Sequence, residues 1–236
     1  MEFCDKLFFV SLSVFAISAL PTPYCFILSL ITHTSILLLT DETYHHKGFK
    51  KYSYSSRNSS DVNALIQIVV VSMWLVVNAP DVGSLSLVSH EDEVIANCLT
   101  YMLGYLIVDL GVVVFHLFSY SFVLHHILIA SSIVMSLAHG RCLLSLFLFM
   151  LEEISTPFLN STWRTIKMKK DHRKISAVFG LVFVLSRFVY GSFVTRAVTR
   201  QILESNNVVD WINLVLVLYP SRLLNIVWLV KIIGMA

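Results

Sequence analysis

The chain has 236 residues, of which 56% are hydrophobic and 14% charged, and its mean hydropathy is +0.76. Soluble domains carry about 25% charged residues, so this composition excludes a single water-soluble domain. A net charge of +2 is too small and too dispersed for a nucleic-acid-binding protein. The cysteines lie far apart, which indicates neither a disulfide framework nor a structural zinc site; they are Cys4, Cys25, Cys98 and Cys142. We therefore expect a polytopic membrane protein.

The first apolar region, Leu7–Thr40, is long enough to cross a bilayer but contains Pro21 and Pro23. Proline kinks a helix, so the region predicts one bent span with an apolar lead-in or two short spans, and we count one crossing. Six further apolar segments follow: Val62–Ala79, Cys98–Phe118, Leu124–His139, Cys142–Leu159, Ile175–Thr199 and Val208–Val230. The third and fourth are short and closely linked, which fits two spans or a partly re-entrant hairpin.

These apolar runs are continuous rather than alternating, and continuous runs are typical of helices. The sequence therefore predicts an all-α, polytopic transmembrane helical bundle of about seven spans. We divide it into an N-terminal span with a basic cytosolic loop, residues 1–56, and a membrane domain, residues 57–236.

Charge sets the expected orientation of the bundle. Basic residues gather in the predicted loops 41–61 and 164–174, whereas the loop 80–97 holds acidic residues and no Lys or Arg. Basic loops stay in the cytosol. With seven spans both basic loops fall on that side, so we expect the N-terminus outside and the C-terminus inside.

Charged residues within the predicted spans are informative, because each costs about 2.5–3.5 kcal/mol at a helix centre. Asp109 lies mid-span with Tyr105 on the same helical face, and Arg187 lies near the centre of its span. Glu152 and Glu153 are adjacent, so we expect only one of them to face the interior. Such groups either pair to fix the packing of the bundle or face a lipid or substrate.

The pair His125-His126 opens the span that follows Asp109. Neighbouring side chains on a helix point about 100° apart, so one imidazole can reach a cavity while the other finds a supporting partner. A neutral imidazole can accept or donate a proton, or attack an activated acyl group. The two histidines are therefore the catalytic candidates, with Asp109 as the residue that orients them.

Several motifs, taken in order, resemble one family. The segments are Gly104–Leu110 (GYLIVDL), Leu124-His125-His126, Leu151–Asn160 (LEEISTPFLN) with Trp163, Ser186-Arg187-Phe188 and Leu224–Ile232. Together they are similar to the TLC domain, a multipass module shared by ceramide synthases, translocon-associated proteins and lipid-homeostasis proteins. Within that family the chain is most similar to the TLC domain-containing protein 4 type, and the resemblance covers residues 57–232.

The chain also departs from the family pattern. Asn63 stands where the family usually has a histidine, and asparagine cannot shuttle protons at neutral pH. Ceramide synthases carry paired aspartates where this chain has Glu152 or Glu153 followed by Ser155 or Thr156. The resemblance implies a lipid-binding site; its expected residues are Tyr105, Asp109, Glu152, Glu153, Asn160, Arg187 and Asn225.

Two functions remain after these comparisons of motifs. The first is a protein that binds or handles lipid acyl chains and influences membrane lipid composition. The alternative is a ceramide-synthase-like, acyl-CoA-dependent N-acyltransferase, in which His126 rather than His125 is the favoured base. A channel or transporter ranks below both, because the sequence has neither a pore-loop signature nor an inverted repeat.

The expected partners follow from these two functions. They are membrane lipids or fatty acyl chains, with acyl-CoA under the alternative; we expect no nucleic acid, no cofactor and no metal. The resemblance implies a multi-pass protein of the endoplasmic reticulum or another endomembrane, with the plasma membrane as the alternative.

Overall fold

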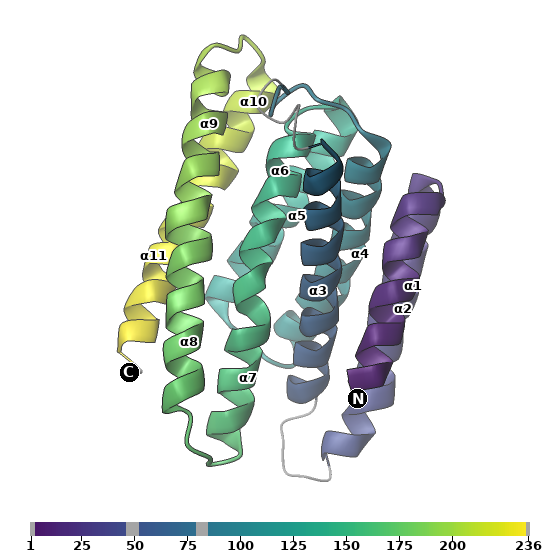
Figure 1. Cartoon of the computed structure of the whole chain (residues 1–236), viewed down its shortest axis with the longest axis vertical. Coiled ribbons are helices and arrows are strands. Elements are labelled where there is room, and N and C mark those ends of the chain that lie inside the picture. Colours follow the sequence, from purple (N-terminus) through teal and green to yellow (C-terminus); the bar gives the residue numbers. More distant parts are fainter. Residues whose placement is uncertain (1–2, 46–51, 79–84, 235–236) are drawn as a thin grey trace.

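The computed structural model describes residues 3–45, 52–78 and 85–234. These residues form long helices that lie side by side and alternate in direction, and no strand occurs among them (Figure 1). In chain order the elements are α1 (Phe3–Ala19), α2 (Thr22–His45), α3 (Ser53–Asn78), α4 (Glu93–Phe115), α5 (Tyr120–His139), α6 (Leu143–Phe149), η1 (Met150–Ser155), α7 (Thr156–Lys167), α8 (Arg173–Phe183), η2 (Val184–Tyr190), α9 (Gly191–Leu203), α10 (Val208–Ile212), η3 (Asn213–Leu218) and α11 (Tyr219–Ile233).

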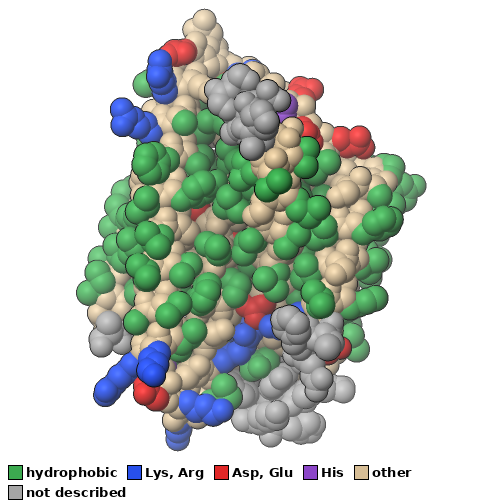
Figure 2. Space-filling view, in the orientation of Figure 1, with side chains coloured by type: hydrophobic (Ala, Val, Ile, Leu, Met, Phe, Trp, Pro, Cys, Tyr) green, Lys and Arg blue, Asp and Glu red, His purple; other side chains and the backbone are tan. Residues whose placement is uncertain are grey.

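Within the described residues, seven helices are long and apolar enough to cross a membrane. The prediction of an all-α bundle of about seven spans is therefore confirmed. The two short segments on either side of Gly140 are complete spans, Tyr120–His139 and Leu143–Lys167, rather than a re-entrant hairpin. Figure 2 shows hydrophobic side chains over the middle height of one face and charged side chains towards the two ends.

Among the described residues of the N-terminal region, one helix is long and apolar enough to cross a membrane, Thr22–Thr40, and the separate helix α1 precedes it. The chain leaves the helix at Leu20-Pro21, so α1 and α2 form an antiparallel pair (Figure 1). Lys6 near the start of α1 contacts Asp61 of α3 at 2.6 Å. The first turns of α1 therefore lie at the lower end in Figure 1, where α11 also ends. Helix α1 thus runs back along the bundle, and the side of the membrane on which each terminus lies stays a prediction.

The two predicted basic loops are shorter than expected. Helix α3 begins at Ser53 and α7 continues to Lys167, so Arg57 and Arg164 lie within helices. Their polar heads are held there by side chains of the facing helix: Arg57 donates to Asn160 of α7, and Arg164 donates to Asp61 of α3. Because these contacts satisfy the two guanidinium groups, α3 and α7 can include Arg57 and Arg164 within the bundle.

Helix α4 lies at the centre of the packing, and α2 packs closely along it. Gly104 permits this approach, since a Cβ atom at its position would lie 2.7 Å from the Cβ of Ser29. The Ser29 hydroxyl donates to the carbonyl of Tyr101 at 2.6 Å. In lipid, burying apolar surface between helices contributes little free energy, so helices associate mainly through close packing at small residues and through interhelical hydrogen bonds.

Three long spans change their winding near their middle. The segment η1 is a 3₁₀ helix, and η2 and η3 are π-helical. Such local departures from α-helical winding occur frequently at functional sites. Here they coincide with Glu152, Arg187 and Asn213, whose side chains are buried.

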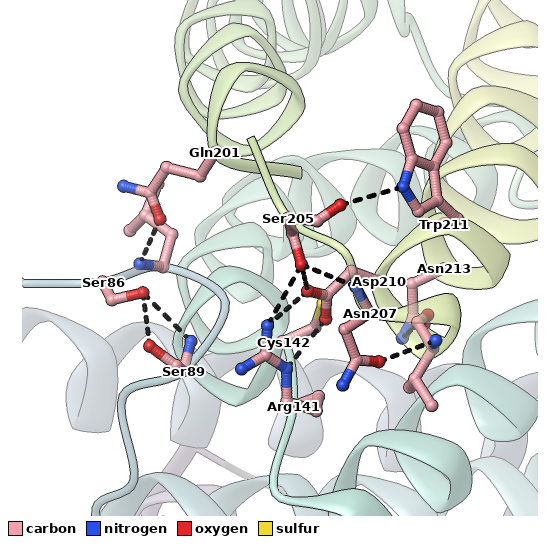
Figure 3. Close-up of polar contacts among 12 residues, drawn as sticks. Ser86, Ser89, Arg141, Cys142, Gln201, Ser205, Asn207, Asp210, Trp211 and Asn213 are labelled. Carbon is pink, nitrogen blue, oxygen red and sulfur yellow. Dashed lines mark hydrogen bonds and ion pairs between the residues drawn. The ribbon is translucent and has the colours of Figure 1, made fainter. Parts of the chain in front are cut away.

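A buried ion pair joins two turns at the upper end (Figure 3). Asp210 of α10 is fully buried and accepts a hydrogen bond from Arg141 Nε at 3.0 Å, while Ser205 donates to its second oxygen at 2.5 Å. Arg141 lies in the turn between α5 and α6, and Ser205 in the turn between α9 and α10. The carboxylate therefore fixes these two turns to each other.

We expect Asp210→Asn to destabilise the protein by about 2–3 kcal/mol. The loss is smaller than the 3–5 kcal/mol typical of breaking a fully buried pair, because Arg141 keeps some contact with water. Unfolding in a mild detergent by titration with sodium dodecyl sulfate measures the change. Arg200→Ala is the control: its pair with Glu204 is almost fully exposed, so its effect should stay below about 0.5 kcal/mol. Equal effects of the two variants would contradict the role of Asp210.

The Cys142 thiol lies beside the same carboxylate, with Sγ 3.5 Å from Asp210 Oδ1. Burial, reinforced by that negative charge, raises the pKa of the Cys142 thiol to about 12. At pH 8 the thiolate fraction should then be about 10⁻⁴, and only the thiolate reacts. A variant that keeps Cys142 as its single cysteine should resist N-ethylmaleimide at pH 8 and react fully in denaturing detergent. Rapid labelling of the folded protein would contradict this environment.

Candidate functional site

Two connected chambers occupy the interior of the bundle. The lower chamber has a volume of about 370 Å³ and is bounded by α3, α4, α5, α7, α8 and α11. The upper chamber, of about 80 Å³, is lined mainly by apolar side chains, including Leu99, Ile133, Phe149, Val198, Leu214 and Val217. Met102, His125, Glu153 and Arg187 line both chambers, so the two spaces meet at these residues.

Every residue that the sequence predicted for the site lines this double cavity. Tyr105, Asp109, His126 and Asn160 line the lower chamber, Glu152 and Asn225 the upper one, and His125, Glu153 and Arg187 both. These side chains come from six different elements of the chain. The fold therefore gathers them around one internal space.

His126 and Asp109 form a buried pair between α5 and α4. Nε2 of His126 lies 2.9 Å from Asp109 Oδ2, and Nδ1 lies 2.7 Å from the carbonyl oxygen of Phe122. Ser56 donates to the other carboxylate oxygen at 2.6 Å. Because both ring nitrogens face acceptors, the pair is satisfied when the ring carries two protons or when one proton resides on Asp109. His126 thus has no nitrogen left for a molecule in the cavity.

His125 has the opposite environment. Its ring packs edge-on against Trp228, with centroids 5.2 Å apart, and lies next to His126. No hydrogen bond joins His125 to another side chain in the described part of the chain. Since it lines both chambers, His125 is the imidazole that a bound molecule can reach. His125 is therefore the ring whose nitrogens are open to the cavity, whereas the ring of His126, which the sequence favoured as the base, is held by Asp109 and Phe122.

Both glutamates of η1 face the interior, contrary to the expectation that only one would. Arg187 lies between them, with its nitrogens 3.7 Å from Glu152 Oε2 and 3.6 Å from Glu153 Oε1. Glu152 also forms a bidentate pair with Arg222 of α11. One guanidinium can serve two adjacent carboxylates here because the cavity extends on both sides of the 3₁₀ turn. The two negative and two positive charges cancel.

Polar side chains hold Arg187 in this position. Its Nε donates to the hydroxyl of Ser155 at 3.3 Å, and its Nη1 donates to Asn225 Oδ1 at 3.2 Å. Asn225 therefore orients the arginine from α11, as Ser155 does from η1. Sequence reasoning missed Arg222 as a member of this network; the available signal was its place within the last span, three residues before Asn225.

Asn160 forms the lower wall together with residues of α3. Its amide donates to Asp61 Oδ1 at 2.7 Å, and its carbonyl accepts from Arg57 Nη1 at 2.8 Å. Sequence reasoning assigned Arg57 to a cytosolic loop and missed it as a residue of the cavity. The available signal was its position at one helical turn before the polar residues Asp61 and Asn63.

Asn63, which replaces the histidine usual in the family, does not line either chamber. It is buried between α3 and α4, where Nδ2 lies 3.2 Å from Met102 Sδ and its carbonyl accepts from Gln67 at 3.3 Å. The substitution therefore leaves a satisfied amide behind Met102. In the described part of the chain, no group of three His, Cys, Asp or Glu side chains is placed to hold a metal ion.

Comparison with protein families agrees with this architecture. The family model of the TLC domain matches residues 24–234, nearly the whole chain. The chain therefore belongs to the TLC-domain family. Neither the curated proteins nor the solved structures compared with it give a match.

We expect Gly191→Ala to disrupt the central charge network. Gly191 begins α9, and a Cβ atom there would collide with the carboxylate of Glu152 and the guanidinium of Arg222. Overpacking of this kind costs about 1–3 kcal/mol, measured by thermal unfolding in detergent. Gly111→Ala is the matched control: a Cβ at Gly111 meets nothing within 4 Å, and alanine favours a helix interior. Equal stabilities for the two variants would contradict the close approach at Gly191.

Proposed function

We propose that this protein binds an acyl-chain lipid inside the bundle, with the polar part of the lipid in the lower chamber and its chain directed to the upper one. The observation that carries the proposal is the double cavity: Arg57, Asp109 and Lys231 line its lower chamber, and its upper chamber continues past mutually paired charges between mainly apolar side chains. A volume of about 370 Å³ lies within the range of small-molecule sites, roughly 300–1,000 Å³. An amphiphile matches both ends of such a space.

The surrounding chemistry supports a lipid over a polar solute. The upper chamber offers aliphatic side chains and Phe149, and each buried methylene contributes about 0.8 kcal/mol. The buried charges of Glu152, Glu153, Arg187 and Arg222 compensate one another, so the chamber can accept an apolar chain without leaving an open charge beside it. By binding such lipids the protein would influence membrane lipid composition.

Finer assignments follow from the motifs. The series GYLIVDL, His125-His126 and LEEISTPFLN favours a protein of the TLC domain-containing protein 4 type. On the same resemblance we place the protein in the endoplasmic reticulum or another endomembrane. The basic turn between α7 and α8 would then face the cytosol.

We expect Met102→Trp to reduce lipid binding about tenfold, because a larger ring at the junction of the chambers fills the path of the acyl chain. Binding is measured by native mass spectrometry of the purified protein with a diacyl phosphatidylcholine. Val77→Trp is the control, since Val77 is 78% exposed on the outer face of α3. Equal binding by the parent and both variants would place the lipid outside the cavity and overturn the proposal.

A second candidate function is acyl-CoA-dependent N-acyl transfer, and the unpaired ring of His125 favours it. In this reaction the amine nitrogen of a long-chain base attacks the thioester carbonyl, an amide bond forms and the bond to sulfur breaks. His125 would accept the proton released by the amine and return it to the thiolate of coenzyme A. The His126–Asp109 pair would hold the neighbouring turn of α5 in place.

If the protein is this acyltransferase, His125→Ala should lower the rate of amide formation by about 10²–10⁴, the usual contribution of a general base. The assay combines purified protein, palmitoyl-CoA and sphinganine, and detects the N-acyl product by mass spectrometry. His126→Ala should cost less, because its ring supports rather than reacts. Absence of product with the parent protein would remove this candidate and leave the lipid-binding proposal unaffected.

A further inference from the structure

The lower chamber carries an excess of positive charge on its lower side. Arg57 of α3 and Lys231 of α11 both line it, from opposite sides of the space. Figure 2 shows Lys and Arg side chains gathered at this end of the molecule.

Asp61, one helical turn after Arg57 on α3, is already fully occupied. Asp61 accepts from Lys6 at 2.6 Å, from Arg164 at 2.6 Å and from Asn160 at 2.7 Å. Two cations therefore share this single negative charge. Arg57 itself donates to the neutral amide of Asn160 and stacks on Trp163, with its guanidinium carbon 4.3 Å from the ring centroid.

The acidic residues deeper in the cavity are also occupied. Asp109 is bound by His126 and Ser56, while Glu152 and Glu153 are matched by Arg187 and Arg222. Among the described side chains, no carboxylate forms an ion pair with Arg57 or Lys231. The described side chains thus leave these two positive charges, on the lower side of the chamber, without a carboxylate in direct contact.

An uncompensated charge at the edge of a membrane-embedded cavity is costly unless a ligand supplies its partner. Arg57 is half-buried and held in one orientation by Asn160 and Trp163. A guanidinium that is already ordered can bind two oxygens of one phosphate at little further entropic cost. Lys231 is exposed and adds a mobile charge at the entrance.

We infer that the lower chamber recognises an amphiphile with a phosphate-bearing, net-negative head group, which Arg57 binds directly and Lys231 attracts. This inference rests on the proposed lipid-binding function and specifies the class of ligand. The acyl chain then extends past Met102 into the upper chamber, where the charged side chains pair with one another and most of the wall is apolar.

Competition between two matched lipids tests the inference. Purified protein is mixed with equal amounts of dioleoyl phosphatidic acid and dioleoyl phosphatidylcholine, and the bound ratio is read by native mass spectrometry. We expect the parent protein to prefer phosphatidic acid at least fivefold. Arg57→Gln and Lys231→Gln should each reduce that preference severalfold, since a basic residue near a membrane surface contributes about 1 kcal/mol towards an anionic lipid, a factor of about five. Lys231→Gln changes an exposed side chain and keeps the test valid if Arg57→Gln does not fold.

Arg173→Gln is the matched control, because Arg173 is exposed at the same end of the bundle and does not line the chamber. It should leave the preference unchanged; an equal loss in this variant would show general surface attraction and overturn the inference. A parent protein that binds both lipids equally, in a manner blocked by Met102→Trp, also overturns the inference but upholds the lipid-binding function. Binding that Met102→Trp does not affect would instead overturn the proposed function.

A third arm identifies the source of the phosphate. Palmitoyl-CoA is added to the parent protein loaded with phosphatidic acid, and the same titration is repeated with Arg57→Gln. Displacement that weakens in the variant supports a site that accepts phosphates of an acyl-CoA. Retention of phosphatidic acid supports the head group of a phospholipid as the ligand.

Discussion

The constraint on which this structure depends is that a charge inside the membrane must have a partner. Asp61, Asp109, Glu152 and Asp210 are all buried, and each is bound by a basic side chain from another part of the chain. Because an unpaired carboxylate would be very costly in this environment, these four pairs fix which helices lie side by side. They stabilise one arrangement of helices whose apolar surfaces would otherwise tolerate several.

The same constraint shapes the cavity. The helices that surround the cavity could pack into a solid core, but Glu152, Arg187 and Asn225 need space and partners on more than one side. The 3₁₀ turn η1 carries Glu152 and the π-helical turn η2 carries Arg187, and these turns bring the two side chains to the same level of the bundle. Gly191 lets Glu152 and Arg222 approach the backbone of α9 closely. The interior space therefore results from accommodating a charge network within an apolar bundle.

Two asymmetries give this cavity its chemical character. The ring of His126 is hydrogen-bonded to Asp109, whereas the ring of His125 has no hydrogen-bond partner among the described side chains. Two adjacent histidines therefore differ in whether a molecule in the cavity can bind them. Carboxylates deep in the cavity are neutralised whereas Arg57 at its lower side is not. Membership of the TLC-domain family agrees with a role towards lipids, and these asymmetries indicate where a head group and a chain would lie.

The all-α class, the approximate number of spans and the family could be predicted from the amino-acid sequence, because apolar run length and the cost of Asp109 or Arg187 within a span are local properties. Most of the polar residues that line the cavity could be predicted in the same way, but Arg57 and Arg222 were missed. The sequence by itself did not determine the path of α1, the inward direction of both Glu152 and Glu153, or the place of Arg57 in the cavity wall. Those features depend on contacts between residues up to about a hundred positions apart, such as Arg57 with Asn160. Only the packed bundle decides which side chains are brought within hydrogen-bond distance of a partner. For this reason His126 contacts Asp109, whereas the neighbouring His125 faces the cavity.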